Sequence, residues 1–136
     1  MKTIVVIDED VEDHEIVTQA FYSKDPSTHC LCYEDPTVAI SQLSNHTIPQ
    51  VDYILIGLHM NRMDGLECLR AIKKMPKYRQ VDTIILSTKF QDDECTGLFK
   101  AGAKAVCVKP STWDGFLAIA DTVLNGRTPP GRVMSF

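Results

Sequence analysis

Side chains that could act on a phosphoryl group or hold a metal follow three apolar runs of this chain. They are Asp8 and Glu9 after residues 2–7, Ser87 and Thr88 after residues 83–86, and Lys109 after residues 105–108. Carboxylate oxygens suit a hard cation such as Mg²⁺. A hydroxyl can donate a hydrogen bond to an oxyanion, and a lysine supplies a positive charge for one. Phosphoryl transfer to a central carboxylate would require these groups, if the fold brings them together.

A fourth apolar run ends without such a side chain. Residues 53–56 are followed by Gly57, then by Leu58 and His59 in a loop that closes with Asp64-Gly65. Gly57 offers only backbone atoms. The sequence therefore raises the question of what the neighbouring groups do without a carboxylate at this position.

Strand-like apolar runs alternate with helical patterns along the whole chain. The strand-like runs are residues 2–7, 28–33, 53–56, 83–86 and 105–108. This alternation predicts a parallel sheet with helices on both faces and right-handed crossovers. The functional crevice of such a sheet lies outside the carboxyl ends of its strands. We therefore expect Asp8, Gly57, Ser87 and Lys109 to meet at one edge of the sheet.

Length and composition limit the classes of protein that fit. A chain of 136 residues with 44% hydrophobic and 24% charged residues is typical of one globular domain. A net charge of -4 argues against a DNA-binding surface, which needs a basic stripe. No apolar run reaches the roughly 18 to 20 residues of a membrane span. The start of the chain is too short for a signal peptide. We expect a cytoplasmic protein that binds neither DNA nor a membrane.

The chain has five cysteines, an odd number. Cys30 and Cys32 are alternate residues of a strand-like run, so their thiols face one side of it. A zinc site usually needs four ligands in paired spacings, and the sequence contains no second pair of this kind. We expect the cysteines to act as small buried hydrophobic residues in a reducing compartment.

Four segments, in order, resemble those of response-regulator receiver domains, the CheY-like family of two-component signalling. They are the acidic cluster 7–13, the loop 58–67, the hydroxyl segment 84–88, and Gly102-Ala103 with residues 108–110. The resemblance extends over residues 3–125. It implies an α/β, flavodoxin-like doubly wound sheet of five parallel strands in the order 2-1-3-4-5, with five helices on two faces. We expect a receiver-like domain over residues 1–126 and a short disordered tail over residues 127–136.

The resemblance also implies a role for each matching residue. The implied metal site contains Asp8, Glu9 and the backbone of His59, and the implied phosphate and switch site contains Ser87, Thr88 and Lys109. The phosphoacceptor aspartate of the family falls on Gly57. Asn61 replaces the usual loop proline, and Val106 replaces the usual aromatic switch residue. These departures together remove both ends of the family's relay from phosphorylation to the signalling face.

We expect a stand-alone, phosphorylation-independent interaction module that is not an enzyme and requires no cofactor. Lys109 should pair with Asp8 or Glu9, and any Mg²⁺ binding should be weak. The expected partner is a histidine kinase or a downstream effector, bound through the face around Asp92 to Phe116.

Two alternatives remain open. In the first, the chain is a phosphorylatable regulator in which Gly57 is a substitution or another acid accepts the phosphoryl group. In the second, it is an FMN-binding, flavodoxin-like protein, although the loop Asp8-Glu9-Asp10 would repel phosphate.

Overall fold

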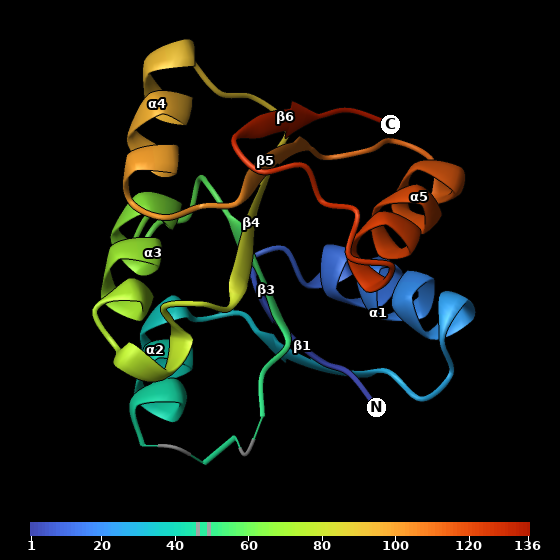
Figure 1. Cartoon of the computed structure of the whole chain (residues 1–136), viewed down its shortest axis with the longest axis horizontal. Coiled ribbons are helices and arrows are strands. Elements are labelled where there is room, and N and C mark those ends of the chain that lie inside the picture. Colours follow the sequence, from blue (N-terminus) through green and yellow to red (C-terminus); the bar gives the residue numbers. More distant parts are fainter. Residues whose placement is uncertain (46, 49) are drawn as a thin grey trace.

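The computed structural model describes residues 1–45, 47–48 and 50–136. A single parallel sheet runs through the molecule in the strand order β2-β1-β3-β4-β5-β6 (Figure 1). Its strands are β1 (Thr3–Ile7), β2 (His29–Tyr33), β3 (Tyr53–Gly57), β4 (Asp82–Ser87), β5 (Ala105–Val108) and β6 (Arg132–Met134). The helices are α1 (Val11–Lys24), α2 (Pro36–Ser44), α3 (Gly65–Lys73), α4 (Asp92–Lys100) and α5 (Trp113–Leu124), with a 3₁₀ turn at Pro76–Tyr78.

Two apolar layers sandwich the sheet. Helices α1 and α5 cover one face, and α2, α3 and α4 cover the other (Figure 1). Alternate residues of each strand enter opposite layers, so that Ile4 and Val6 pack under α1 and α5 while Val5 and Ile7 pack under α2 and α3. Burial on both faces explains why the strands read as continuous apolar runs in the sequence. This confirms the prediction of a flavodoxin-like sheet with helices on two faces.

Side-chain caps fix the starts of helices that leave the carboxyl edge of the sheet. The side chain of Asp10 accepts a hydrogen bond from the backbone N–H of Glu12 at the start of α1, and Asp64 accepts one from Glu67 at the start of α3. Each cap satisfies a backbone donor that the helix itself cannot pair. Acids near the carboxyl edge therefore serve two purposes, because some of them cap helices rather than form a site.

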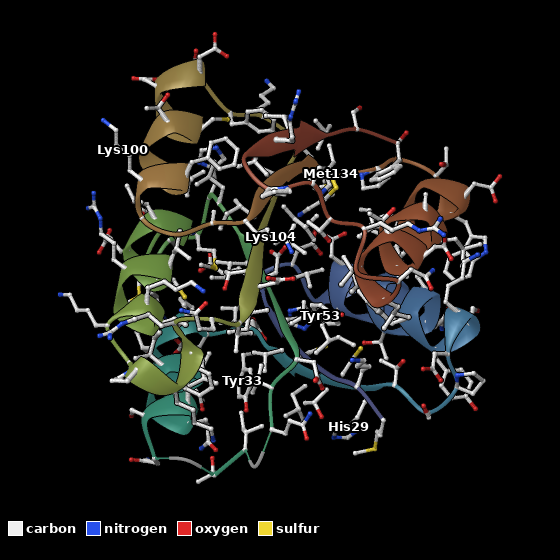
Figure 2. All side chains as sticks on the ribbon, viewed as in Figure 1. His29, Tyr33, Tyr53, Lys100, Lys104 and Met134 are labelled. Atoms are coloured by element: carbon white, nitrogen blue, oxygen red, sulfur yellow. The ribbon has the colours of Figure 1, made fainter. Side chains whose placement is uncertain are left out.

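The prediction of five strands is wrong, because the segment 127–136 contributes a sixth. β6 pairs in parallel with β5, with Arg132 opposite Ala105 and Met134 opposite Cys107. The chain reaches this position through Gly131, which has a φ of 69° and whose backbone N–H donates to the Lys104 carbonyl at 2.7 Å. Met134 is 6% exposed and joins the layer under α5 (Figure 2). The expectation of a disordered tail therefore fails for Arg132–Met134.

Buried thiols predict a loss of stability at alkaline pH. Burial raises the pKa of the Cys68 and Cys107 thiols from 9.0 to about 12. Below pH 9.0 the thiols are protonated in both the folded and the unfolded chain. Between pH 9.0 and about 12 they ionise only in the unfolded chain, so the free energy of unfolding falls as the pH rises.

Cys107→Ala should reduce this alkaline slope by up to about 1.4 kcal/mol per pH unit, the value for one proton. The measurement is urea unfolding at a series of pH values. The slope of the free energy of unfolding against pH is compared between the unaltered chain and Cys107→Ala. An unchanged slope in the variant would show that Cys107 does not carry the effect.

Candidate functional site

The strand register brings the predicted site residues to one edge of the sheet. Ile7 pairs with Ile56, which sets Asp8 beside Gly57 at the ends of β1 and β3. Gly57 pairs with Leu86, and Ser87 pairs with Val108, so Lys109 follows directly after the next strand end. Asp8, Gly57, Ser87 and Lys109 therefore lie around the carboxyl ends of four consecutive strands in the sheet.

The Asp8 carboxylate occupies the space in front of Gly57. A Cβ atom added to Gly57 would lie 2.9 Å from Cγ of Asp8 and 3.0 and 3.1 Å from its two carboxylate oxygens. Real Cβ atoms essentially never approach other atoms to within 3.0 Å. Asp8 is 7% exposed, so it cannot move aside without rearranging its own contacts. The absence of a side chain at Gly57 is what allows Asp8 to hold this position.

Lys109 joins β5 to both β1 and α1. Its ammonium Nζ lies 3.2 Å from Oδ2 of Asp8 and 2.5 Å from Oδ2 of Asp13. The three side chains are 17%, 11% and 14% exposed, in the order Lys109, Asp8, Asp13. The pairing expected for Lys109 is thus made with Asp8 and not with Glu9. We call Asp8, Asp13 and Lys109 the ion triad.

The ion triad is largely shielded from solvent, and burial and charge shift the pKa values of its members in opposite directions. Burial raises the pKa of the Asp13 carboxyl above 3.8, although its hydrogen bond from Lys109 acts in the opposite direction. Burial alone would lower the pKa of the Lys109 ammonium, but the hydrogen bond to Asp13 and the charge of Asp8 raise it above 10.5. Lys109 therefore stays protonated, and its positive charge stabilises both buried carboxylates.

Further hydrogen bonds fix Asp8 from the side of α1. Its Oδ1 accepts from the backbone N–H of Asp10 at 3.0 Å, and its backbone carbonyl lies 2.6 Å from Nε2 of His14. Asp13 entered the predictions from sequence only as part of the acidic cluster 7–13, and His14 had no predicted role. The position of Asp13 in the first turn of a helix that starts at this sheet edge is a signal that could have identified it.

Glu9 points away from the ion triad. Its Oε1 accepts from the backbone N–H of Asn61 at 2.5 Å, which ties the β1–α1 loop to the β3–α3 loop. With Asp8 bound to Lys109 and Glu9 bound to Asn61, the two predicted metal-site acids do not converge. Among the described residues, no three side chains of His, Cys, Asp or Glu form a group that could hold a metal ion. In this conformation the two acids do not form a preassembled site for a divalent cation.

The Ser87 hydroxyl is engaged within its own loop. It donates to the carbonyl of Lys89 at 2.6 Å and accepts from the backbone N–H of Lys89 at 3.3 Å. The same carbonyl lies 2.9 Å from Nε2 of His59, while Thr88 is exposed. Ser87 is 4% exposed, so these bonds satisfy a buried polar group. The hydroxyl therefore stabilises the β4–α4 loop, and both of these hydrogen bonds are made with Lys89 and not with the ion triad.

The β3–α3 loop requires a glycine at position 65. The backbone N–H of Gly65 donates to the Leu58 carbonyl at 2.7 Å. A Cβ atom on Gly65 would lie 2.7 Å from the carbonyl oxygen of Gly57 and 2.8 Å from Cα of Leu58. The Asp64-Gly65 pair thus closes the loop tightly over the end of β3, which holds the backbone of Gly57 against Asp8.

A parallel sheet of this topology, with acids, a hydroxyl and a lysine at the carboxyl ends of its central strands, is the architecture of receiver domains. The chain belongs to the response regulator receiver domain family, whose model matches residues 4–121. It is a receiver domain of two-component signalling, as the resemblance implied.

Comparison with individual proteins agrees with this assignment. Over 107 residues, or 79% of the chain, it is 24% identical to the cyclic di-GMP phosphodiesterase response regulator RpfG of Xanthomonas campestris pv. campestris (strain 8004). The chain spans only 28% of the length of that relative. None of the helices in the described ranges is long and apolar enough to span a membrane.

Solved structures share the fold at low sequence identity. The Mn²⁺-bound form of response regulator Rcp1 matches with a TM-score of 0.81 and 17% identity, covering 94% of this chain and 95% of that chain. CheY in the CheX–CheY–BeF₃–Mg²⁺ complex of Borrelia burgdorferi matches with a TM-score of 0.75 and 22% identity, covering 91% and 89% of the two chains.

Proposed function

We propose that this receiver domain is an interaction module whose conformation is not controlled by aspartyl phosphorylation. The observation that carries the proposal is the ion triad in front of Gly57. The resemblance places the phosphoacceptor at Gly57, which has no carboxylate to receive a phosphoryl group. The Asp8 carboxylate fills the space where that side chain would stand, and Lys109 neutralises it.

The other end of the relay supports the same proposal. Val106, at the position of the aromatic switch residue, is fully buried in the layer under α2, α3 and α4. The Ser87 hydroxyl bonds within its own loop. The phosphoacceptor and the aromatic switch residue are both missing, and the Ser87 hydroxyl is hydrogen-bonded to Lys89. Together these features stabilise a single conformation of the domain. On this proposal the domain is not an enzyme.

Metal binding is at most weak on this proposal. The Rcp1 and CheY structures are described with Mn²⁺ and Mg²⁺, and those ions prefer carboxylate ligands. Here Lys109 already supplies the positive charge beside Asp8, and Gly57 supplies no carboxylate. A divalent cation would have to displace the lysine, so no cofactor is required for the proposed function.

The partner is a signalling protein, either a histidine kinase or a downstream effector, met in the cytoplasm. The face around Asp92 to Phe116 carries α4, β5 and the start of α5. The edge of β5 is covered by β6, where Val133 is 48% exposed. We therefore assign the contact surface to α4, β6 and α5, with β6 in place of the edge of β5.

The test is phosphorylation by acetyl phosphate. The chain is incubated with acetyl phosphate and Mg²⁺, and its intact mass is measured. We expect no added phosphoryl group, since no carboxylate occupies the acceptor position. Gly57→Asp is the matched comparison, because it restores that carboxylate. A hydroxylamine-labile gain of one phosphoryl group by the unaltered chain would overturn the proposal and favour a substitute acceptor.

A further inference from the structure

Two thiols lie together on the edge strand β2, on the side that faces α1. Cys30 packs against the layer formed by α1 and α5, whereas Leu31 and Tyr33 pack in the opposite layer. Cys30 and Cys32 are alternate residues of the strand, so they share this side. Both are free thiols, and Cys32 is exposed. The proposed function makes no use of them.

A hydroxyl of α1 lies beside the exposed thiol of this pair. Oγ1 of Thr18, on α1, lies 3.4 Å from Sγ of Cys32. Burial raises the pKa of Cys30 to about 11 and also raises that of Cys32, and a hydrogen bond with Thr18 acts against the rise in each. Thr18 therefore contacts Cys32, and Cys30 lies two residues away on the same side of the strand.

The spacing along the strand favours a metal bridge over a disulfide. Alternate residues of a strand are about 6.6 Å apart, and their Cβ atoms, which project from the same face, have about the same spacing. The two Cβ atoms of a disulfide lie only about 3.8 Å apart. Two metal–thiolate bonds of about 2.3 Å span about 4.6 Å between sulfurs in a linear bridge. Because each Cβ–Sγ bond can lean inward, the bridge fits an undistorted strand and the disulfide does not.

The ligand set selects a soft cation of low coordination number. A structural zinc ion takes four ligands, and the described residues contain no group of three or more His, Cys, Asp or Glu that could hold a metal. Soft thiolates select Cu(I), zinc and iron–sulfur clusters, and of these Cu(I) is the one that two thiolates can hold, since zinc sites and iron–sulfur clusters take four protein ligands. Cys32 is exposed, so an ion can reach it directly from solvent.

We propose that Cys30 and Cys32 form a dithiolate site for Cu(I), with Thr18 as a positioning residue. Two S–H bonds break and two Cu–S bonds form, and two protons pass to solvent. Copper enters and stays as Cu(I), so no electron is transferred. At neutral pH the thiols are protonated, which leaves the site inert until an ion able to displace both protons arrives.

The experiment is an anaerobic titration of the full, reduced chain with Cu(I) in the presence of bicinchoninate, a coloured chelator of that ion. We expect the chain to remove one Cu(I) per molecule from the chelator. Cys30→Ser and Cys32→Ser should each weaken binding by more than about 100-fold, since each removes a ligand. Thr18→Val should weaken it by about 10-fold, the usual effect of losing a residue that orients a ligand.

Cys95→Ser is the matched control, because Cys95 is a free thiol on α4 in the opposite layer. It should bind Cu(I) like the unaltered chain, and circular dichroism establishes that each variant is folded. Three results would overturn the proposal: all copper remains on the chelator, the two β2 variants bind normally, or binding requires two chains per ion. The last result would mean that thiols from separate molecules share the metal.

Discussion

Gly57→Asp is expected to lower the free energy of unfolding by about 1 to 3 kcal/mol in metal-free buffer. The new Cβ atom would meet Cγ of Asp8 at 2.9 Å, so the Asp8 side chain must leave its position beside Lys109. Two carboxylates would then share one poorly solvated space, and like charges at this range shift a pKa by one or more units. Mg²⁺ should reverse much of the loss, because it binds the paired carboxylates of the folded chain only.

The measurement is urea unfolding followed by the fluorescence of Trp113, the single tryptophan of the chain, with and without Mg²⁺. Gly57→Ala is the control, since it introduces the same steric contact without a charge. The difference between the two variants isolates the charge repulsion. Equal stabilities of the Asp and Ala variants in metal-free buffer would show that repulsion between the two carboxylates costs little, against the expected result.

Lys109→Met should lower the free energy of unfolding by about 3 to 5 kcal/mol near neutral pH. The substitution leaves Asp8 and Asp13 buried without a counter-charge, and removing one partner of a buried pair is strongly destabilising. The loss should shrink as the pH falls, because protonation removes the charges. It should also shrink in the double variant Lys109→Met, Asp13→Asn, which carries one buried carboxylate fewer.

Lys104→Met provides the matched control. Lys104 pairs with Asp82 at 3.0 Å, but these side chains are 27% and 30% exposed. A pair of this exposure contributes about 0 to 1 kcal/mol. Chemical unfolding of the two single variants under the same conditions compares them directly. Similar losses for Lys104→Met and Lys109→Met would contradict the special role of the ion triad.

Much of the fold could be predicted because the strands are buried on both faces. Residues 4–7 and 84–86 are unbroken apolar runs at the centres of β1 and β4, and the polar residues that follow them, Asp8 and Ser87, mark where these strands end. The alternation with helices then determines the sheet type and places Asp8, Gly57 and Lys109 at one edge. The acidic caps Asp35 and Asp64 mark the starts of α2 and α3 in the sequence.

Contacts between distant side chains could not be predicted in the same way. Asp13 carries the same sequence signal whether it complements the dipole of α1 or pairs with Lys109, and only the packing of α1 distinguishes the two. Ser87 has two local partners in the Lys89 backbone, and the sequence does not show that these compete with the site. β6 has three residues, which is too short for an alternation pattern to identify it.

The sixth strand changes where this domain ends. The family match stops at residue 121, inside α5, yet Met134 is part of the core. A chain shortened to the family boundary would lose the end of α5 and uncover the backbone edge of β5. Uncovered edges recruit strands from other molecules. β6 replaces this edge with a strand of only three residues, and very short edge strands pair poorly with other chains. The protection comes from residues outside the segment that the family model matches.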